Sequence, residues 1–147
     1  MQRHKAAILG FAAATIVGLA SWLAWTAAQT KALMAERGAL RSVVDALAVY
    51  GHQYKGQLPP DLEALSIYYP AAQLSDIRAM VIMDPDLTIA GLLSRRDDLL
   101  SSSWQPIRLR HPKFAGRADC SANPRLLLVL EQLVKEFPDV SSRPVPE

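Results

Sequence analysis

The chain has 147 residues, of which 50% are hydrophobic and 20% are charged, and its formal net charge is +2. This near balance of charge argues against a nucleic-acid partner held by bulk electrostatics. The single cysteine excludes an intramolecular disulfide and any metal site built from several thiolates. The length suits one small folded core, because two domains would each be marginal in size.

The N-terminal part contains an uncharged apolar stretch that runs from Ala6 to Ala28. As a helix it would reach about 34 Å, enough to cross a hydrocarbon core of about 30 Å. Trp22 and Trp25 lie near its C-terminal end, where indole rings favour a membrane interface. The stretch predicts a signal anchor, with a cytoplasmic tail at 1–5 and a transmembrane helix at 6–28.

The residues before this stretch predict its orientation. Arg3 and Lys5 make the leading tail basic, which favours a single-pass inner-membrane protein with its C-terminal domain in the periplasm. Small residues at Gly10, Ala14 and Gly18 would let another membrane helix approach closely. The expected partners are therefore the lipid bilayer and other membrane or envelope proteins, with homo-oligomerisation left open.

A cleaved signal peptide is the alternative interpretation of the same stretch. Thr26 to Ala28 offer small residues at which cleavage would be possible. The chain would then be a secreted soluble enzyme or ligand-binding domain.

An amphipathic stem helix is predicted at 29–56. Its large apolar side chains recur at heptad spacing. They are Leu33, Leu40, Val43, Leu47, Tyr50 and Tyr54. The stripe predicts packing on a small globular head, and a coiled coil between two stems is the alternative. Gly56 suits a C-terminal cap, and Pro59 with Pro60 prevents the helix from continuing.

The end of this stem resembles the type IV pilin-like proteins, particularly the pseudopilins of type II secretion. The matching residues are Ala46-Leu47, Tyr50, Gly56, Leu58-Pro59, Leu62 and Leu65. The resemblance covers residues 1–65 and implies an extracytoplasmic protein that acts by protein contacts in an envelope, secretion or pilus-type assembly.

Filament subunits of that family are cleaved after a glycine, and the mature chain has Glu at its fifth position. Gly10-Phe11 would be the cleavage pair here, and Thr15 stands at the fifth position. Thr15 has no charge to pair with the amine of a neighbouring subunit. We therefore expect a full-length protein that does not form homopolymers.

The predicted head at 57–138 combines helices and strands, and the tail at 139–147 is expected to be flexible. The run 79–83 predicts a strand, and the alternating run 104–112 predicts a second. The apolar spacing over 123–137 favours a helix over a buried strand. The expected fold class is α+β, with a long N-terminal helix packed on a small mixed α/β head.

Few side chains carry catalytic or metal-binding chemistry, so we predict a protein that is not an enzyme and has no cofactor or metal. His52, His111 and Cys120 lack the spacing of a metal site or a thiol–imidazole couple. Asp84 and Asp86 flank a proline, as in a turn. A basic group predicts either a solvated strand face or a contact patch for protein or lipid, and nucleic acid is not expected. Its members are Arg108, Arg110, His111, Lys113 and Arg117.

Overall fold

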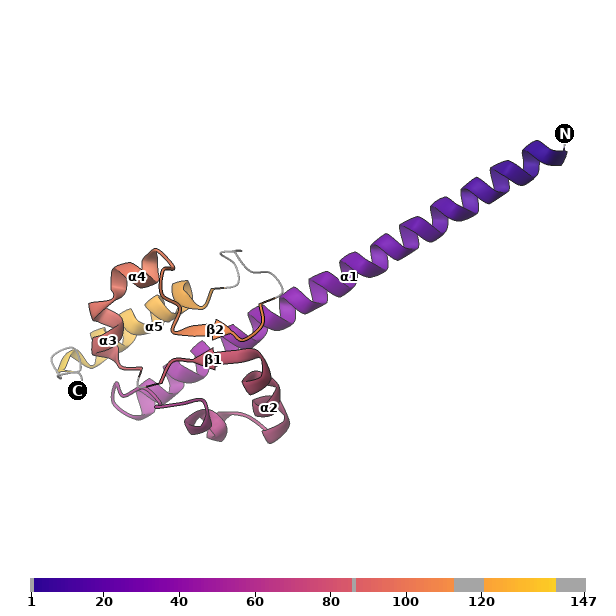
Figure 1. Cartoon of the computed structure of the whole chain (residues 1–147). Helices are drawn as coiled ribbons and strands as arrows, with labels where there is room; N and C mark the ends of the chain where they lie inside the picture. The colour runs from indigo at the N-terminus through magenta and orange to yellow at the C-terminus, as the bar shows by residue number, and fades with distance from the viewer. Residues whose placement is uncertain (1, 86, 113–120, 140–147) are drawn as a thin grey trace. The chain divides into compact units, whose positions relative to one another are not determined.

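The computed structural model describes the backbone of residues 2–85, 87–112 and 121–139 and, within these ranges, the side chains from Thr15 on. The chain divides into two compact units, one up to residue 35 and one from residue 36. The elements, labelled in Figure 1, are α1 (Gln2–Gln53), the 3₁₀ helix η1 (Glu63–Tyr68), α2 (Ala71–Met80), β1 (Val81–Met83), α3 (Ile89–Ser94), α4 (Arg96–Leu100), β2 (Ile107–Leu109) and α5 (Asn123–Glu136). A long N-terminal helix, further helices and a small sheet make this an α+β fold, as predicted.

The first unit is the N-terminal part of α1. Within the part of the chain that the structure describes, no helix is long and apolar enough to cross a membrane. This finding contradicts the transmembrane helix and signal anchor at 6–28, and with them the single-pass inner-membrane location. The physical reason is dilution of the apolar stretch from Thr15 on. The polar residues that dilute it are Thr15, Ser21, Thr26, Gln29, Thr30 and Lys31. The side chains of Ala6, Gly10 and Ala14 lie outside the described ones.

The second unit has a hydrophobic core to which the C-terminal part of α1 contributes one face. Val43, Val44 and Leu47 have no exposed surface. The α1 members of the core are Ala39, Leu40, Val43, Val44, Ala46 and Leu47. The buried face is wider than a two-position heptad stripe, because the core covers the helix along two adjacent rows of side chains.

The other stem positions lie at the margins of this core. Tyr50 is half-buried against it, and Leu33, in the first unit, is half-buried. Tyr54 is 41% exposed and its ring stacks on Tyr50, with 4.2 Å between the ring centroids. Tyr54 departs from the heptad stripe because α1 ends at Gln53.

The end of α1 has the glycine cap that the sequence predicts. Gly56 has a φ of 84°, and its N–H donates to the carbonyl oxygen of Gly51 over 2.7 Å. Glycine is the residue that takes this left-handed conformation without steric cost. The chain then turns into η1, and the N–H of Ala64 donates to the Asp61 carboxylate over 2.9 Å.

The sheet consists of β1 and β2, which pair antiparallel with Val81 opposite Leu109 (Figure 1). Ile107 and Leu109 are buried and Arg108 between them is exposed, as the sequence alternation predicts. Both strands are shorter than predicted: β1 begins at Val81 because α2 continues to Met80, and β2 covers Ile107–Leu109 of the predicted 104–112.

Three helices complete the core. The predicted helix at 123–137 is α5, and α3 and α4 both pack against it. Thr88 caps α3, since its hydroxyl oxygen accepts a hydrogen bond from the N–H of Gly91 over 3.0 Å.

Replacing Leu47 by Ala should lower the free energy of unfolding by about 2–5 kcal/mol, because the change opens a cavity in the core. Val49 lies on the same helix and is 51% exposed, so Val49→Ala should cost less than about 0.5 kcal/mol. Urea unfolding of the full chain measures both. Equal losses for the two variants would contradict the burial of this face of α1.

Candidate functional site

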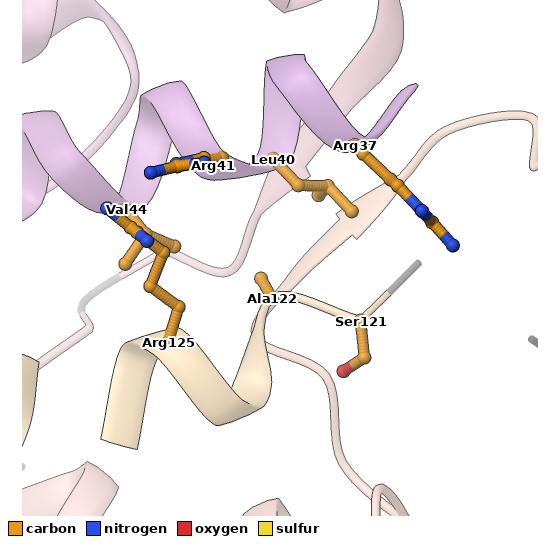
Figure 2. Close-up of a pocket in the computed structure, with 7 residues that line it drawn as sticks. All are labelled: Arg37, Leu40, Arg41, Val44, Ser121, Ala122 and Arg125. Atoms are coloured by element: carbon orange, nitrogen blue, oxygen red, sulfur yellow. The ribbon is translucent and has the colours of Figure 1, made fainter. Parts of the chain in front are cut away.

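A hollow of about 380 Å³ lies between α1 and the start of α5. Its lining residues are Arg37, Leu40, Arg41, Val44, Ser121, Ala122 and Arg125. Figure 2 shows Leu40 and Ala122 facing each other across it, with Arg37 towards one end and Arg41 towards the other. The hollow therefore combines an apolar floor with cationic side chains at its ends.

Two of the arginines, from different elements, lie beside the same carboxylate. Arg125, near the start of α5, pairs with Asp45 of α1, with 2.6 Å between Nη2 and Oδ1. Arg41 lies 3.9 Å from the other oxygen of Asp45, an i,i+4 pair on the helix surface. These pairs are solvent-exposed, so each contributes little stability and leaves the guanidinium groups accessible to solvent.

The start of α5 is held by a buried amide. The Nδ2 group of Asn123 donates to the carbonyl oxygen of Leu99 over 3.0 Å and to that of Trp104 over 2.8 Å. Asn123 is 1% exposed, so these two hydrogen bonds form away from water. They join α5 to the end of α4 and to the segment before β2, and so place Ser121, Ala122 and Arg125 opposite α1.

The α1 side of the hollow is held by a tyrosine. The Tyr69 hydroxyl donates to the carbonyl oxygen of Ser42 over 2.5 Å and accepts from the Ser42 hydroxyl over 3.2 Å. Burial raises the pKa of the Tyr69 hydroxyl; the nearby Asp45 carboxylate also raises this pKa, and the Ser42 hydrogen bond opposes the rise. Ser42 lies next to Arg41, so this contact fixes the turn of α1 that lines the hollow.

The predicted basic patch is not part of this hollow. Arg108 forms an ion pair with Asp84, which also accepts a hydrogen bond from the Trp104 indole over 3.0 Å. The guanidinium of Arg95 lies 4.0 Å from the centre of the Trp104 ring. Asp84 therefore has a structural role beside β2.

Two of the remaining members of the patch lie in the described part of the chain and two lie outside it. Arg110 and His111 are exposed at the end of β2, and Arg110 donates its backbone N–H to the carbonyl of Met80 over 2.7 Å. Lys113 and Arg117 lie outside the described residues.

Of the residues considered for catalysis and metal binding, the structure describes His52, Asp84 and His111. His52 pairs with Glu136, with 2.7 Å between Nδ1 and Oε2, and Asp86 and Cys120 are outside the described residues. In the described ranges, no three His, Cys, Asp or Glu side chains are grouped to hold a metal ion.

Sequence reasoning did not find the hollow. Arg37 and Arg41 suit a solvated helix face, and Arg125 lies 80 residues from its partner Asp45. The i,i+4 spacing of Arg37 and Arg41 was the available signal, since it places both on one side of α1. Only the fold brings Arg125 to the same place.

Asn123→Ala should lower the free energy of unfolding by about 2–3 kcal/mol, because two buried carbonyl oxygens lose their donor. Gln132 is an exposed amide on the same helix, so Gln132→Ala should change stability by less than about 0.5 kcal/mol. Urea unfolding compares the two variants. A loss below about 0.5 kcal/mol at Asn123 would mean that the amide does not hold α5.

The raised pKa of Tyr69 predicts a loss of stability at alkaline pH. The unfolded hydroxyl ionises near pH 10, below the folded pKa, so its contribution is complete below about pH 10 and is lost as the pH rises through the folded value. Between about pH 8 and pH 10.5, the parent should therefore lose more unfolding free energy than Tyr69→Phe does. Urea unfolding at the two pH values measures this difference, and equal losses would refute it.

Comparison with known proteins yields no match, whether with family models, with curated proteins or with solved structures. The resemblance to pilin-like proteins thus remains a prediction from residues 1–65.

Proposed function

We propose that this protein acts through protein–protein contacts in a secretion or pilus-type assembly, with a pilin-like body whose stem packs on a small head. The observation that carries the proposal is the exposure of apolar side chains on α1 between residues 16 and 25. Six of them are between 57% and 66% exposed. They are Ile16, Val17, Leu19, Trp22, Leu23 and Trp25.

These side chains point to all sides of the helix, because successive residues are about 100° apart. A helix that is apolar all round is stable when other groups enclose it. Covering each large side chain contributes about 1.5–3 kcal/mol, so six of them favour a tight association. We assign the cover to helices of other subunits, whose side-chain ridges fit a helix surface of this kind.

Burial in the second unit supports the pilin-like body. Val43 and Leu47 of the stem lie in one core with Leu65, which follows the Gly56 cap. The residues that match the pilin-like pattern thus lie in the stem, in the turn after it and at the start of the head. Thr15 in place of a glutamate favours association with different subunits over a homopolymer.

Site-specific photocrosslinking in the native cells tests this function. A benzoylphenylalanine at Trp22 should give discrete adducts with another polypeptide, whose crosslinked peptide belongs to a helix. The matched position is Leu128 on α5, which is 62% exposed where Trp22 is 60% exposed, and it should not give these adducts.

A second substitution makes the test specific. Leu19→Glu, placed one turn from Trp22, should remove the adducts, because a charge at an apolar contact is costly to bury. Adducts that persist in Leu19→Glu, or that form equally from Leu128, would refute the proposed contact. The absence of any protein adduct from Trp22 would refute it as well.

A further inference from the structure

We infer that Tyr50 and Tyr54, which stack at the end of α1, are a site of oxidative crosslinking, at which a one-electron oxidant joins the two rings by a carbon–carbon bond. The oxidant is of the class of a haem peroxidase acting with hydrogen peroxide. Both tyrosines belong to the second unit. The inference is therefore independent of the contacts proposed for residues 16–25, and either can fail without the other.

The backbone holds the two rings in contact. Tyr50 and Tyr54 have the i,i+4 spacing that places side chains on one side of a helix, and the N–H of Tyr54 donates to the carbonyl oxygen of Tyr50 over 2.9 Å. Their ring centroids are 4.2 Å apart, with an angle of 25° between the ring planes. Rotation of the side chains is enough to bring the reacting carbons together, so the reaction avoids the entropy cost of a chance encounter.

The pair is open to an oxidant in the solvent. Tyr54 is 41% exposed, whereas Tyr50 is half-buried against the core. The exposed phenol is the one from which an oxidant can remove the first electron. The second phenol is then in contact with a radical that the chain prevents from diffusing away.

The reaction balances in atoms and electrons. Each phenol gives up one electron and the proton of its hydroxyl group, and the two phenoxyl radicals join at a Cε carbon of each ring. The hydrogens on these two carbons then move to the oxygens, which restores both hydroxyl groups. Hydrogen peroxide takes up the two electrons and two protons, so two phenols and one peroxide give one biphenol and two waters.

The other two of the four tyrosines are less suited to this reaction. The Tyr68 hydroxyl donates to Oε1 of Gln53 over 2.6 Å, and the Tyr69 hydroxyl donates to a backbone carbonyl of α1. Burial raises the pKa of the Tyr68 hydroxyl, and the nearby stacked pair raises it further. A phenol that holds its proton more strongly is harder to oxidise to the neutral radical, so the stacked pair should react first.

The crosslink fastens the turn of α1 on which two other elements are anchored. His52 pairs with Glu136 of α5, and Gln53 accepts the hydrogen bond from Tyr68 of η1. Both anchoring residues lie between the two stacked tyrosines in the sequence. A bond between the two rings therefore closes a covalent loop around the residues that attach α5 and η1 to the end of α1.

Oxidation of the full chain by a haem peroxidase with hydrogen peroxide, followed by tryptic digestion and mass spectrometry, tests the inference. Trypsin cuts after basic residues, so the stacked pair lies in the peptide 42–55 and the other two tyrosines lie in the peptide 56–78. The expected product is the peptide 42–55 lighter by two hydrogen atoms. It should be at least about fivefold more abundant than any species in which the two peptides are joined.

Two variants locate the reaction. Tyr54→Phe should remove the product, because a phenylalanine ring forms no phenoxyl radical. Tyr68→Phe is the matched control, since it removes a hydroxyl group at the same end of α1 and leaves the stacked pair in place. The yield from this control should stay within about twofold of the parent yield, as expected for a substitution that leaves the fold unchanged.

Unfolding separates ring contact from sequence spacing. A photochemical one-electron oxidant, tris(bipyridine)ruthenium(II) with persulfate, acts on the full chain both in native buffer and in urea. In urea the helix is lost and the rings meet only transiently, so the yield of the lighter peptide should fall by at least about threefold. Oxygen addition at Trp22 and Trp25, which are 60% and 61% exposed, reports that the oxidant was active.

Four results would overturn the inference. The first is an unchanged mass of the peptide 42–55 when Trp22 and Trp25 have been oxidised. The second is a main product in which the peptides 42–55 and 56–78 are joined. The others are equal yields in buffer and in urea, and an equal loss of product in Tyr54→Phe and Tyr68→Phe.

Discussion

The structure from residue 36 on depends on the burial of one face of α1. The sheet beside it has two strands of three residues each, and an isolated pair of this size is not stable in water. Val43, Val44 and Leu47 give the head an apolar surface on which the sheet and α5 can form a common core. The small elements are therefore held by the long one.

The same packing creates the polar contacts at the edge of the core. Once Leu40 and Val44 are buried, the neighbouring rows of α1 place Arg41 and Asp45 at the boundary with α5. Asn123 fixes the other side of that boundary through backbone carbonyls. The hollow is thus a consequence of how two helices meet, and its charge is set by the side chains that flank the buried rows.

The sequence predicted what depends on local pattern. Apolar spacing identified the helix at α5, alternation identified β2, and glycine at Gly56 marked the end of α1. Tertiary contacts could not be predicted from local pattern, because Arg125 and Asp45 are 80 residues apart in the sequence and Asn123 donates to backbone carbonyls of other elements. The apolar stretch near the N-terminus was interpreted as a membrane span because it is long and carries no charge. Its polar residues from Thr15 on nevertheless make it less hydrophobic than a membrane span.

Two surfaces with opposite chemistry follow from one helical sequence. Residues 16–25 expose apolar side chains in every direction, whereas residues 37–45 bury theirs on one face and keep arginine and aspartate at its edge. Contact with any other apolar surface stabilises an apolar surface, so its selectivity for a partner comes from shape. A guanidinium pair is selective by charge and direction. The strong, unselective property and the weak, selective one therefore belong to separate segments of α1.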